Sequence, residues 1–168
     1  MHIVIRPEQP ADIERIRALT LNAFVNQAQS NHTEHRIIDR LRETHALAIS
    51  LLAEVDGEIV GHIAFSEVDI SDSSTGWYGL GPLSVLPAMQ RKGIGRALVE
   101  AGLKELRKRG AQGCLLLGNP SFYRRFGFAN NPDLLLAEFP QEHFLALSLT
   151  GENARGVVTY HPSFFNNC

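Results

Sequence analysis

Apolar residues along the first third of the chain recur with two spacings, which predict a strand followed by two helices. A short apolar run at residues 3–5 is typical of a strand. From Pro10 onward the spacing changes to one apolar residue every three or four positions, which indicates a helix with one buried face. The residues expected on that face are Ile13, Ile16, Thr20, Ala23 and Phe24. After a polar loop at residues 26–31, Thr33 is expected to cap a second helix with Ile37, Ile38 and Leu41 facing inward.

The next pattern predicts a hairpin of two long strands at residues 47–55 and 58–70. Asp56-Gly57 between them is a strong signal for a two-residue turn. Regular alternation in the second strand places Ile59, Gly61, Ile63, Phe65 and Glu67 on one side, and Val60, His62, Ala64, Ser66 and Val68 on the other.

A third strand is expected at residues 77–85, and it leads through a basic loop into an amphipathic helix. The face of that helix is expected to hold Ile94, Ala97, Leu98, Ala101 and Leu106. Arg107 to Arg109 suit its last turn, and Gly110 suits its end. Beyond it we expect a strand at 114–117, a short helix from Pro120 to Gly127, and strands at 144–149 and 156–160. The elements predict a mixed α/β (α+β) fold.

Composition narrows the class of protein. The chain has 168 residues, 44% of them hydrophobic, and a net charge of −2, so we expect one globular domain over residues 1–168. The near-neutral charge argues against a nucleic-acid binder, and no apolar run is long enough for a membrane span. Cys114 and Cys168 do not suggest a disulfide framework, and no signal peptide is recognised, so a cytoplasmic location is expected.

The loop between residues 85 and 97 has the features of an anion site. It reads Gln90-Arg91-Lys92-Gly93-Ile94-Gly95-Arg96 and lies at the start of a helix, where free backbone N–H groups and the helix dipole favour negative charge. Gly93 and Gly95 let a ligand approach the backbone closely. We therefore predict a pyrophosphate-binding loop. It lacks the Lys-Ser/Thr of a Walker A loop, and Leu98 stands where a dinucleotide fingerprint has Gly or Ala.

The loop resembles motif A of the GNAT superfamily of N-acetyltransferases, Gln/Arg-x-x-Gly-x-Gly/Ala. Gln90, Gly93 and Gly95 match this pattern, and Val85-x-Pro87 matches the preceding strand end. The resemblance implies the acyl-CoA N-acyltransferase fold, with a central, mostly antiparallel sheet that carries a V-shaped split and is flanked by helices. It also implies acetyl-CoA as the co-substrate, without a metal.

A second resemblance extends to nearly the whole chain. Gly118-x-Pro120-x-Phe122-Tyr123-x-Arg125-Phe126-Gly127-Phe128 is similar to the YhbS-like branch of the superfamily, as are the segments at 63–69 and 156–164. That branch often has Asp where this chain has Asn119.

The resemblance implies roles for single residues. Tyr123 would be the general acid that protonates the departing thiolate, although its aromatic neighbours also fit a core position. The backbone at Leu83, Ser84 and Val85 would bond the pantetheine arm and polarise the thioester, and Asn119 would touch the cofactor from the other strand. The full cofactor set predicted is Leu83, Ser84, Val85, Gln90, Arg91, Lys92, Gly93, Ile94, Gly95, Arg96 and Asn119.

The general base is less well defined by the sequence. A lysine-like acceptor, with a pKa of about 10.4, must lose a proton before it attacks. Glu67 ranks first for this role, ahead of Asp69, Glu54 and His62, although acidic residues at strand ends are usually solvated. The spacing of His32, His35 and His45 does not predict a metal site.

We therefore expect an N-acetyltransferase that moves acetyl from acetyl-CoA to a primary amine by direct attack. Two alternatives stay open: a non-catalytic module that binds acyl-CoA or an acyl carrier, and a nucleotide-binding regulator. The acceptor can be a small molecule or a protein, and a homodimer is common in the superfamily.

Overall fold

The computed structural model describes residues 1–27, 30 and 32–165. Part of the loop expected at 26–31, namely residues 28, 29 and 31, lies outside the described residues, as does Cys168. The helices are α1 (Ile13–Phe24), α2 (Glu34–Glu43), α3 (Ile94–Lys108) and α4 (Pro120–Tyr123). The strands are β1 (Ile3–Pro7), β2 (Leu47–Val55), β3 (Glu58–Glu67), β4 (Asp69–Ile70), β5 (Trp77–Val85), β6 (Gly113–Leu117), β7 (Ala129–Asn130), β8 (Leu134–Leu135), β9 (Phe144–Ser148) and β10 (Gly156–Thr159).

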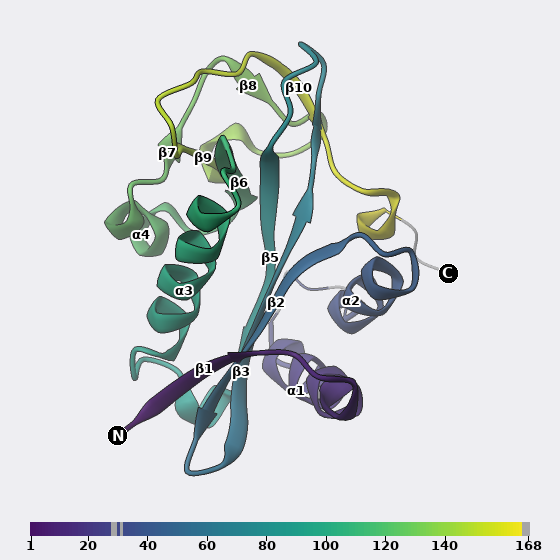
Figure 1. Cartoon of the computed structure of the whole chain (residues 1–168), viewed down its shortest axis with the longest axis vertical. Coiled ribbons are helices and arrows are strands. Elements are labelled where there is room, and N and C mark those ends of the chain that lie inside the picture. Colours follow the sequence, from purple (N-terminus) through teal and green to yellow (C-terminus); the bar gives the residue numbers. More distant parts are fainter. Residues whose placement is uncertain (28–29, 31, 166–168) are drawn as a thin grey trace.

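A seven-stranded sheet forms the centre of the molecule, in the order β1-β2-β3-β5-β6-β9-β7. Its pairs are antiparallel except β5–β6, which is parallel. α3 and α4 lie on one face of this sheet, and α1 and α2 lie on the other (Figure 1). A smaller sheet, β4-β10-β8, lies beside it. The expected mixed, mostly antiparallel sheet flanked by helices is confirmed. No helix within the described residues is both long enough and apolar enough to cross a membrane.

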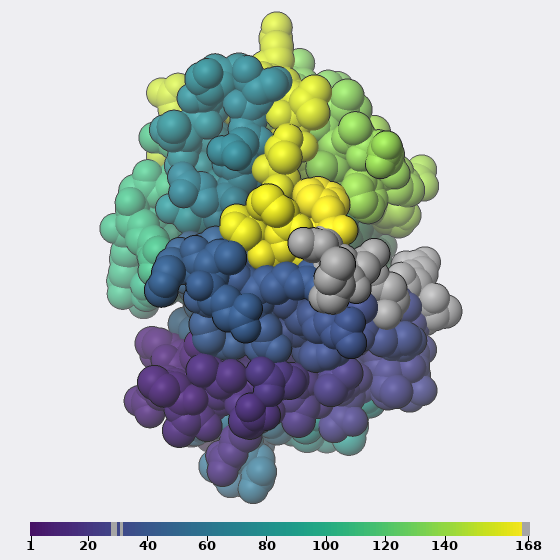
Figure 2. All heavy atoms as spheres, turned by 90° about the vertical axis from the view of Figure 1, so that its right-hand side faces the viewer, coloured from purple at the N-terminus to yellow at the C-terminus, as the bar shows by residue number. Residues whose placement is uncertain are grey.

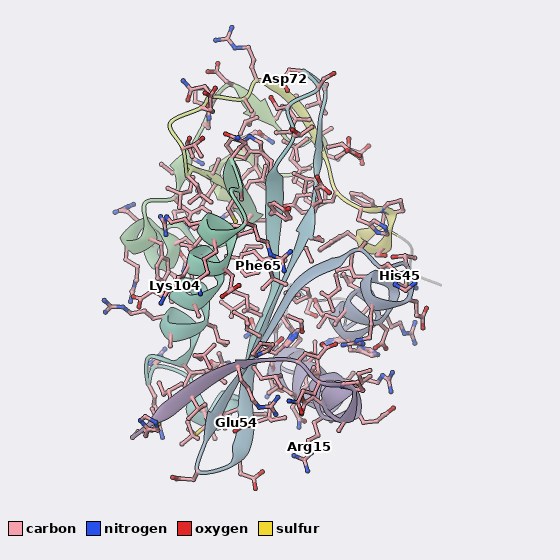
Figure 3. All side chains as sticks on the ribbon, viewed as in Figure 1. Arg15, His45, Glu54, Phe65, Asp72 and Lys104 are labelled. Atoms are coloured by element: carbon pink, nitrogen blue, oxygen red, sulfur yellow. The ribbon has the colours of Figure 1, made fainter. Side chains whose placement is uncertain are left out.

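Two glycines let α3 lie close against the sheet. A Cβ on Gly102 of α3 would overlap the ring of Phe65, which Figure 3 places between α3 and the sheet. A Cβ on Gly61 of β3 would come within 2.9 Å of the side chains of Ile94 and Leu98. Because a core at crystal-like density has no room for these atoms, the two glycines fix the distance between helix and sheet.

β5 and β6 pair over three residues only and then separate. The pairs run from Trp77–Gly113 to Gly79–Leu115, and β5 continues for six residues beyond Gly79. On its other edge β5 stays paired with β3, through a bulge between the Leu80 and Leu83 positions that contains Pro82. The main sheet is therefore split between β5 and β6, as the resemblance implied.

The strand expected at 58–70 is divided in two. β3 ends at Glu67, the Val68 N–H still bonds the carbonyl of Trp77 (3.0 Å), and β4 then pairs with β10 of the smaller sheet. The predicted alternation is also wrong at Ile59 and Val60. A register shift beside Ala53 turns Val60 toward the α3 side of the core, while Ile59 packs with Ile16 and Ile38 of α1 and α2. Such a bulge comes from the pairing with β2, which the sequence of β3 alone does not reveal.

His62 is fully buried in β3 and belongs to a chain of hydrogen bonds. Ser50 donates to Glu8 Oε1 at 2.6 Å, and His62 Nε2 lies 2.7 Å from the Ser50 hydroxyl. Burial alone would raise the pKa of Glu8, but hydrogen bonds from Arg42 and Ser50 hold it below its usual range. Since the single Ser50 proton goes to the Glu8 carboxylate, His62 Nε2 must be the donor to Ser50. Burial lowers the pKa of His62 to about 4.

This pKa predicts a pH-dependent stability. The unfolded histidine has a pKa of about 6.5, so it takes up a proton before the folded one does. The contribution of His62 is complete above about pH 6.5 and is lost as the pH falls toward 4, by at most about 1.4 kcal/mol per pH unit. His62→Gln keeps an N–H donor for Ser50 and removes the titration. Urea unfolding between pH 4.5 and 7 should therefore show a flatter profile in this variant.

The matched control is His35→Gln. Burial also lowers the pKa of the partly exposed His35, and this variant should keep most of the slope. An unchanged slope in His62→Gln would show that His62 is not the group responsible.

Candidate active site

The loop before α3 has the backbone shape of an anion site. Arg91 and Gly93 both have positive φ, +63° and +86°, and Gly93 is the N-cap of α3. The turn brings the free N–H groups of the first helical residues toward one point. The first turn of α3 contains no acidic residue, whereas those of α1 and α2 contain Glu14 and Glu34. The positive end of this helix dipole is therefore left for a ligand.

Gln90 ties the loop to the strand before it. Its side-chain amide donates to the carbonyl of Val85 at 3.2 Å. The Val85 carbonyl must therefore point away from β3. Because backbone groups alternate along a strand, those of Leu83 point the same way, toward the split.

A pocket of about 740 Å³ lies at the mouth of the split, within the range typical of small-molecule sites. Its lining residues are Leu83, Val85, Met89, Gln90, Arg91, Gly93, Gly95, Arg96, Asn119, Phe122 and Arg125. They come from β5, the following loop, α3, α4 with its N-cap Asn119, and the 3-10 turn at Arg124–Phe126 that follows α4. Leu83 and Val85 pack with the core on the α3 side, so the pocket opens on that face of the sheet.

Eight of the eleven residues predicted for the cofactor line this pocket, and three do not. Ser84 and Ile94 have side chains buried in the protein, each 1% exposed, and Lys92 is exposed outside the pocket. Arg96 also forms an ion pair with Glu100 at 2.8 Å, which reduces the positive charge it presents.

Sequence reasoning missed three lining residues: Met89, Phe122 and Arg125. Arg125 lies 5.1 Å from the centre of the Phe122 ring and donates from Nε to the Phe122 carbonyl. The basic pair Arg124-Arg125 was visible in the sequence. Its place beside α3 depends on how α4 packs.

Asn119 has a structural task as well as a place in the pocket. Its Oδ1 accepts a hydrogen bond from the Ser121 N–H at 2.9 Å and so caps α4. Asp would cap equally well. Asn therefore changes the charge of the pocket without changing the cap, and it leaves its NH₂ group as a donor.

Tyr123 packs behind the pocket and is not among its lining residues. Its ring is in edge contact with Phe122 and Phe128, at centroid distances of 4.8 and 5.9 Å, and it covers Gly118 at the end of β6. Burial raises the pKa of Tyr123 well above its ordinary value. The phenol therefore stays protonated at neutral pH, as a proton donor must.

The four base candidates lie apart from this pocket. Glu54 is ion-paired with Arg6 at 2.8 Å and lies near the β2–β3 hairpin (Figure 3), and His62 is bound to Ser50. Glu67 and Asp69 are exposed, and Glu67 pairs with Tyr78 at the start of β5, before the split opens. Glu67 thus stays a prediction. Within the part of the chain described, no three His, Cys, Asp or Glu side chains gather as a metal site requires.

A split sheet with a basic helix N-terminus at its mouth defines the class of acyl-CoA N-acyltransferases. Comparison with known proteins agrees. The model of the acetyltransferase (GNAT) family matches residues 13–128, and the chain belongs to this family.

Relatives cover almost the whole chain. The N-acetyltransferase YhbS of Escherichia coli K12 is 32% identical over 96% of this chain and 98% of its own length. A crystal structure of YhbS from Escherichia coli with CoA matches with a TM-score of 0.90, at 31% identity, over 100% of this chain and 94% of that one. A GNAT family acetyltransferase from Brucella melitensis with acetyl-CoA is 47% identical, with a TM-score of 0.86, over 97% and 98% of the two chains. The resemblance to the YhbS-like branch is confirmed, and the protein is an acyltransferase.

Proposed function

We propose that this acyltransferase moves an acetyl group from acetyl-CoA to a primary amine, without a metal. The observation that carries the proposal is the early end of the β5–β6 ladder next to the pocket before α3. A linear thioester with a diphosphate at one end fits such a site. Crystal structures of two relatives contain acetyl-CoA or CoA, which supports the same ligand here.

The diphosphate would lie on the N-terminus of α3, against the backbone at Gly93 and Gly95 and between Arg91 and Arg125. The pantetheine arm would run along the free edge of β5. There its amides meet the backbone groups of Leu83 and Val85, as an added strand would. Asn119 would contact the arm from the β6 side. A backbone N–H in this segment would polarise the thioester carbonyl.

The reaction needs one bond to form and one to break. The neutral amine attacks the carbonyl carbon, the new C–N bond forms, and the C–S bond breaks. The amine nitrogen loses its extra proton to solvent or to a carboxylate, for which Glu67 is the candidate. The sulfur takes a proton, for which Tyr123 is the candidate, since a positioned phenol can hand over its proton as negative charge grows on the departing sulfur.

A first experiment separates an enzyme from a binding module. Isothermal titration measures acetyl-CoA affinity, and thiol release is then followed with a panel of primary amines. Binding with amine-dependent thiol release supports the proposal. Binding without release from any amine indicates a non-catalytic module.

The loop before α3 is tested by Gly93→Glu. A Cβ at Gly93 meets nothing within 4 Å in the protein itself, so the new carboxylate would occupy the ligand's space and repel its phosphates. We expect acetyl-CoA affinity to fall at least about 100-fold, since bulk and like charge act together. The measurement is isothermal titration.

Gly110→Glu is the matched control for this variant. Gly110 also has positive φ, +73°, also has nothing within 4 Å, and follows the other end of α3. Both variants therefore place a side chain on a residue with positive φ and carry a similar kind of backbone strain. Gly110→Glu should bind acetyl-CoA normally, and equal affinities in the two variants would contradict the proposed loop.

Tyr123→Phe tests the general acid. Loss of a general acid typically slows turnover by about 100-fold or more, while the packing of the ring is preserved. We expect kcat to fall and acetyl-CoA affinity to stay within about twofold. Tyr78→Phe, at a tyrosine outside the pocket, should leave kcat unchanged. Normal turnover in Tyr123→Phe would show that Tyr123 is not the general acid and has a purely structural role.

A further inference from the structure

A second pocket lies on the opposite face of the sheet from the first. Its volume is about 330 Å³. Its described lining consists of Glu34 and Ile37 of α2, Leu117 at the end of β6, Leu136, Phe139, Tyr160, Phe164 and Phe165. Figure 2 shows the C-terminal segment in yellow, directly between α2 in blue and the segment around residues 130–140 in green. The pocket is therefore built where three distant parts of the chain meet.

This pocket lies beside the point at which β5 and β6 separate. A Cβ on Gly79 would lie 3.5 and 3.6 Å from Cε1 and Cζ of Tyr160, so the tyrosine ring covers Gly79. Gly79–Leu115 is the last β5–β6 pair, and Leu117 lies two residues further along the other arm. Tyr160 and Leu117 therefore place the pocket next to the apex of the split, although Gly79 itself is not part of the lining. A thioester entering from the α3 face would meet an acceptor held here.

The walls of the pocket are apolar and largely aromatic. Phe139 is 41% exposed. An exposed phenylalanine beside a concave surface is typical of a binding site. Tyr160 packs against Phe164 with ring centroids 5.1 Å apart. Its hydroxyl is buried and has no hydrogen-bond partner among the described residues. A buried polar atom of this kind is stabilised when a ligand supplies the partner.

The charged side chain in the described lining of this pocket is negative. This side chain is Glu34, and the described lining residues include no Lys, Arg or His. A carboxylate at the edge of an apolar cavity attracts an ammonium group and repels anions. The volume lies at the lower end of the range for small-molecule sites, enough for a single ring with a short chain.

We propose that the acceptor is a small primary amine with an aromatic or similarly apolar body, such as an arylalkylamine. The apolar body occupies the pocket beside Phe139 and Phe164, and the amino group lies at the apex of the split. The inference rests on the proposed function, because it specifies the acceptor of the same reaction.

The test compares 2-phenylethylamine with ethylamine, which share the ammonium group and differ by the ring. Burial of a phenyl ring predicts a KM at least about tenfold lower for 2-phenylethylamine. Phe139→Ala should raise that KM several-fold and leave the KM of ethylamine nearly unchanged. Glu34→Gln should raise both, by less at high salt. The matched control is Leu135→Ala, at an exposed leucine outside the pocket lining.

A direct binding measurement tests the acceptor pocket independently of acetyl transfer. Isothermal titration measures 2-phenylethylamine binding to the CoA-saturated protein. Binding that Phe139→Ala weakens, without acetylation of any amine, supports the pocket and overturns the proposed function. Acetylation with equal KM for both amines, or a KM for 2-phenylethylamine that Phe139→Ala leaves unchanged, overturns the pocket and leaves acetyl transfer standing. If 2-phenylethylamine neither binds to the protein nor is acetylated by it, the inference is overturned. Phe165→Ala, at a ring 51% exposed on the same pocket, gives the same test if Phe139→Ala does not fold.

Discussion

The architecture of the candidate site follows from one feature of the main sheet, the early end of the ladder between β5 and β6. A parallel pair normally continues as long as both strands do, because each unpaired buried backbone group costs free energy. Here β5 continues past Gly79, with Pro82, which has no N–H, inside a bulge on the β3 side. The far edge of β5 thereby keeps backbone donors and acceptors that no strand uses. A ligand with amides along its length is complementary to such an edge.

The two pockets differ in the charge of their lining, and they lie on opposite faces of the split sheet. On the α3 side, a helix without an acidic first turn and Arg91 and Arg125 form a positive surface. On the α2 side, aromatic side chains surround a cavity whose described lining contains one carboxylate, Glu34. Anionic and cationic ligands would therefore be drawn to opposite faces of the sheet. They would meet beyond the Gly79–Leu115 pair, where β5 and β6 no longer pair.

The sequence predicted what depends on short segments and missed what depends on packing. The loop at 90–96, the α3 helix and the hairpin at Asp56-Gly57 are encoded by neighbouring residues, and each was expected. The bulge at Val60 and the break at Val68 follow from pairing with β2 and β10, which lie elsewhere in the chain. The burial of His62 depends on Ser50, Glu8 and Arg42, which only tertiary structure brings together. The short strands β7 and β8, two residues each, carry no periodic signal.

Two buried tyrosines, Tyr123 and Tyr160, lie on opposite faces of the sheet beside the split, and their positions favour different roles. Burial raises the pKa of both, so each remains protonated at neutral pH. Tyr160 lies on the α2 face, among the residues of the apolar cavity. Tyr123 follows Phe122, which lines the pocket on the α3 face. A departing thiolate stays attached to the cofactor arm and leaves toward the α3 face. The donor nearest its path is therefore expected on α4, and Tyr160 is better placed to contact the incoming amine than the outgoing sulfur.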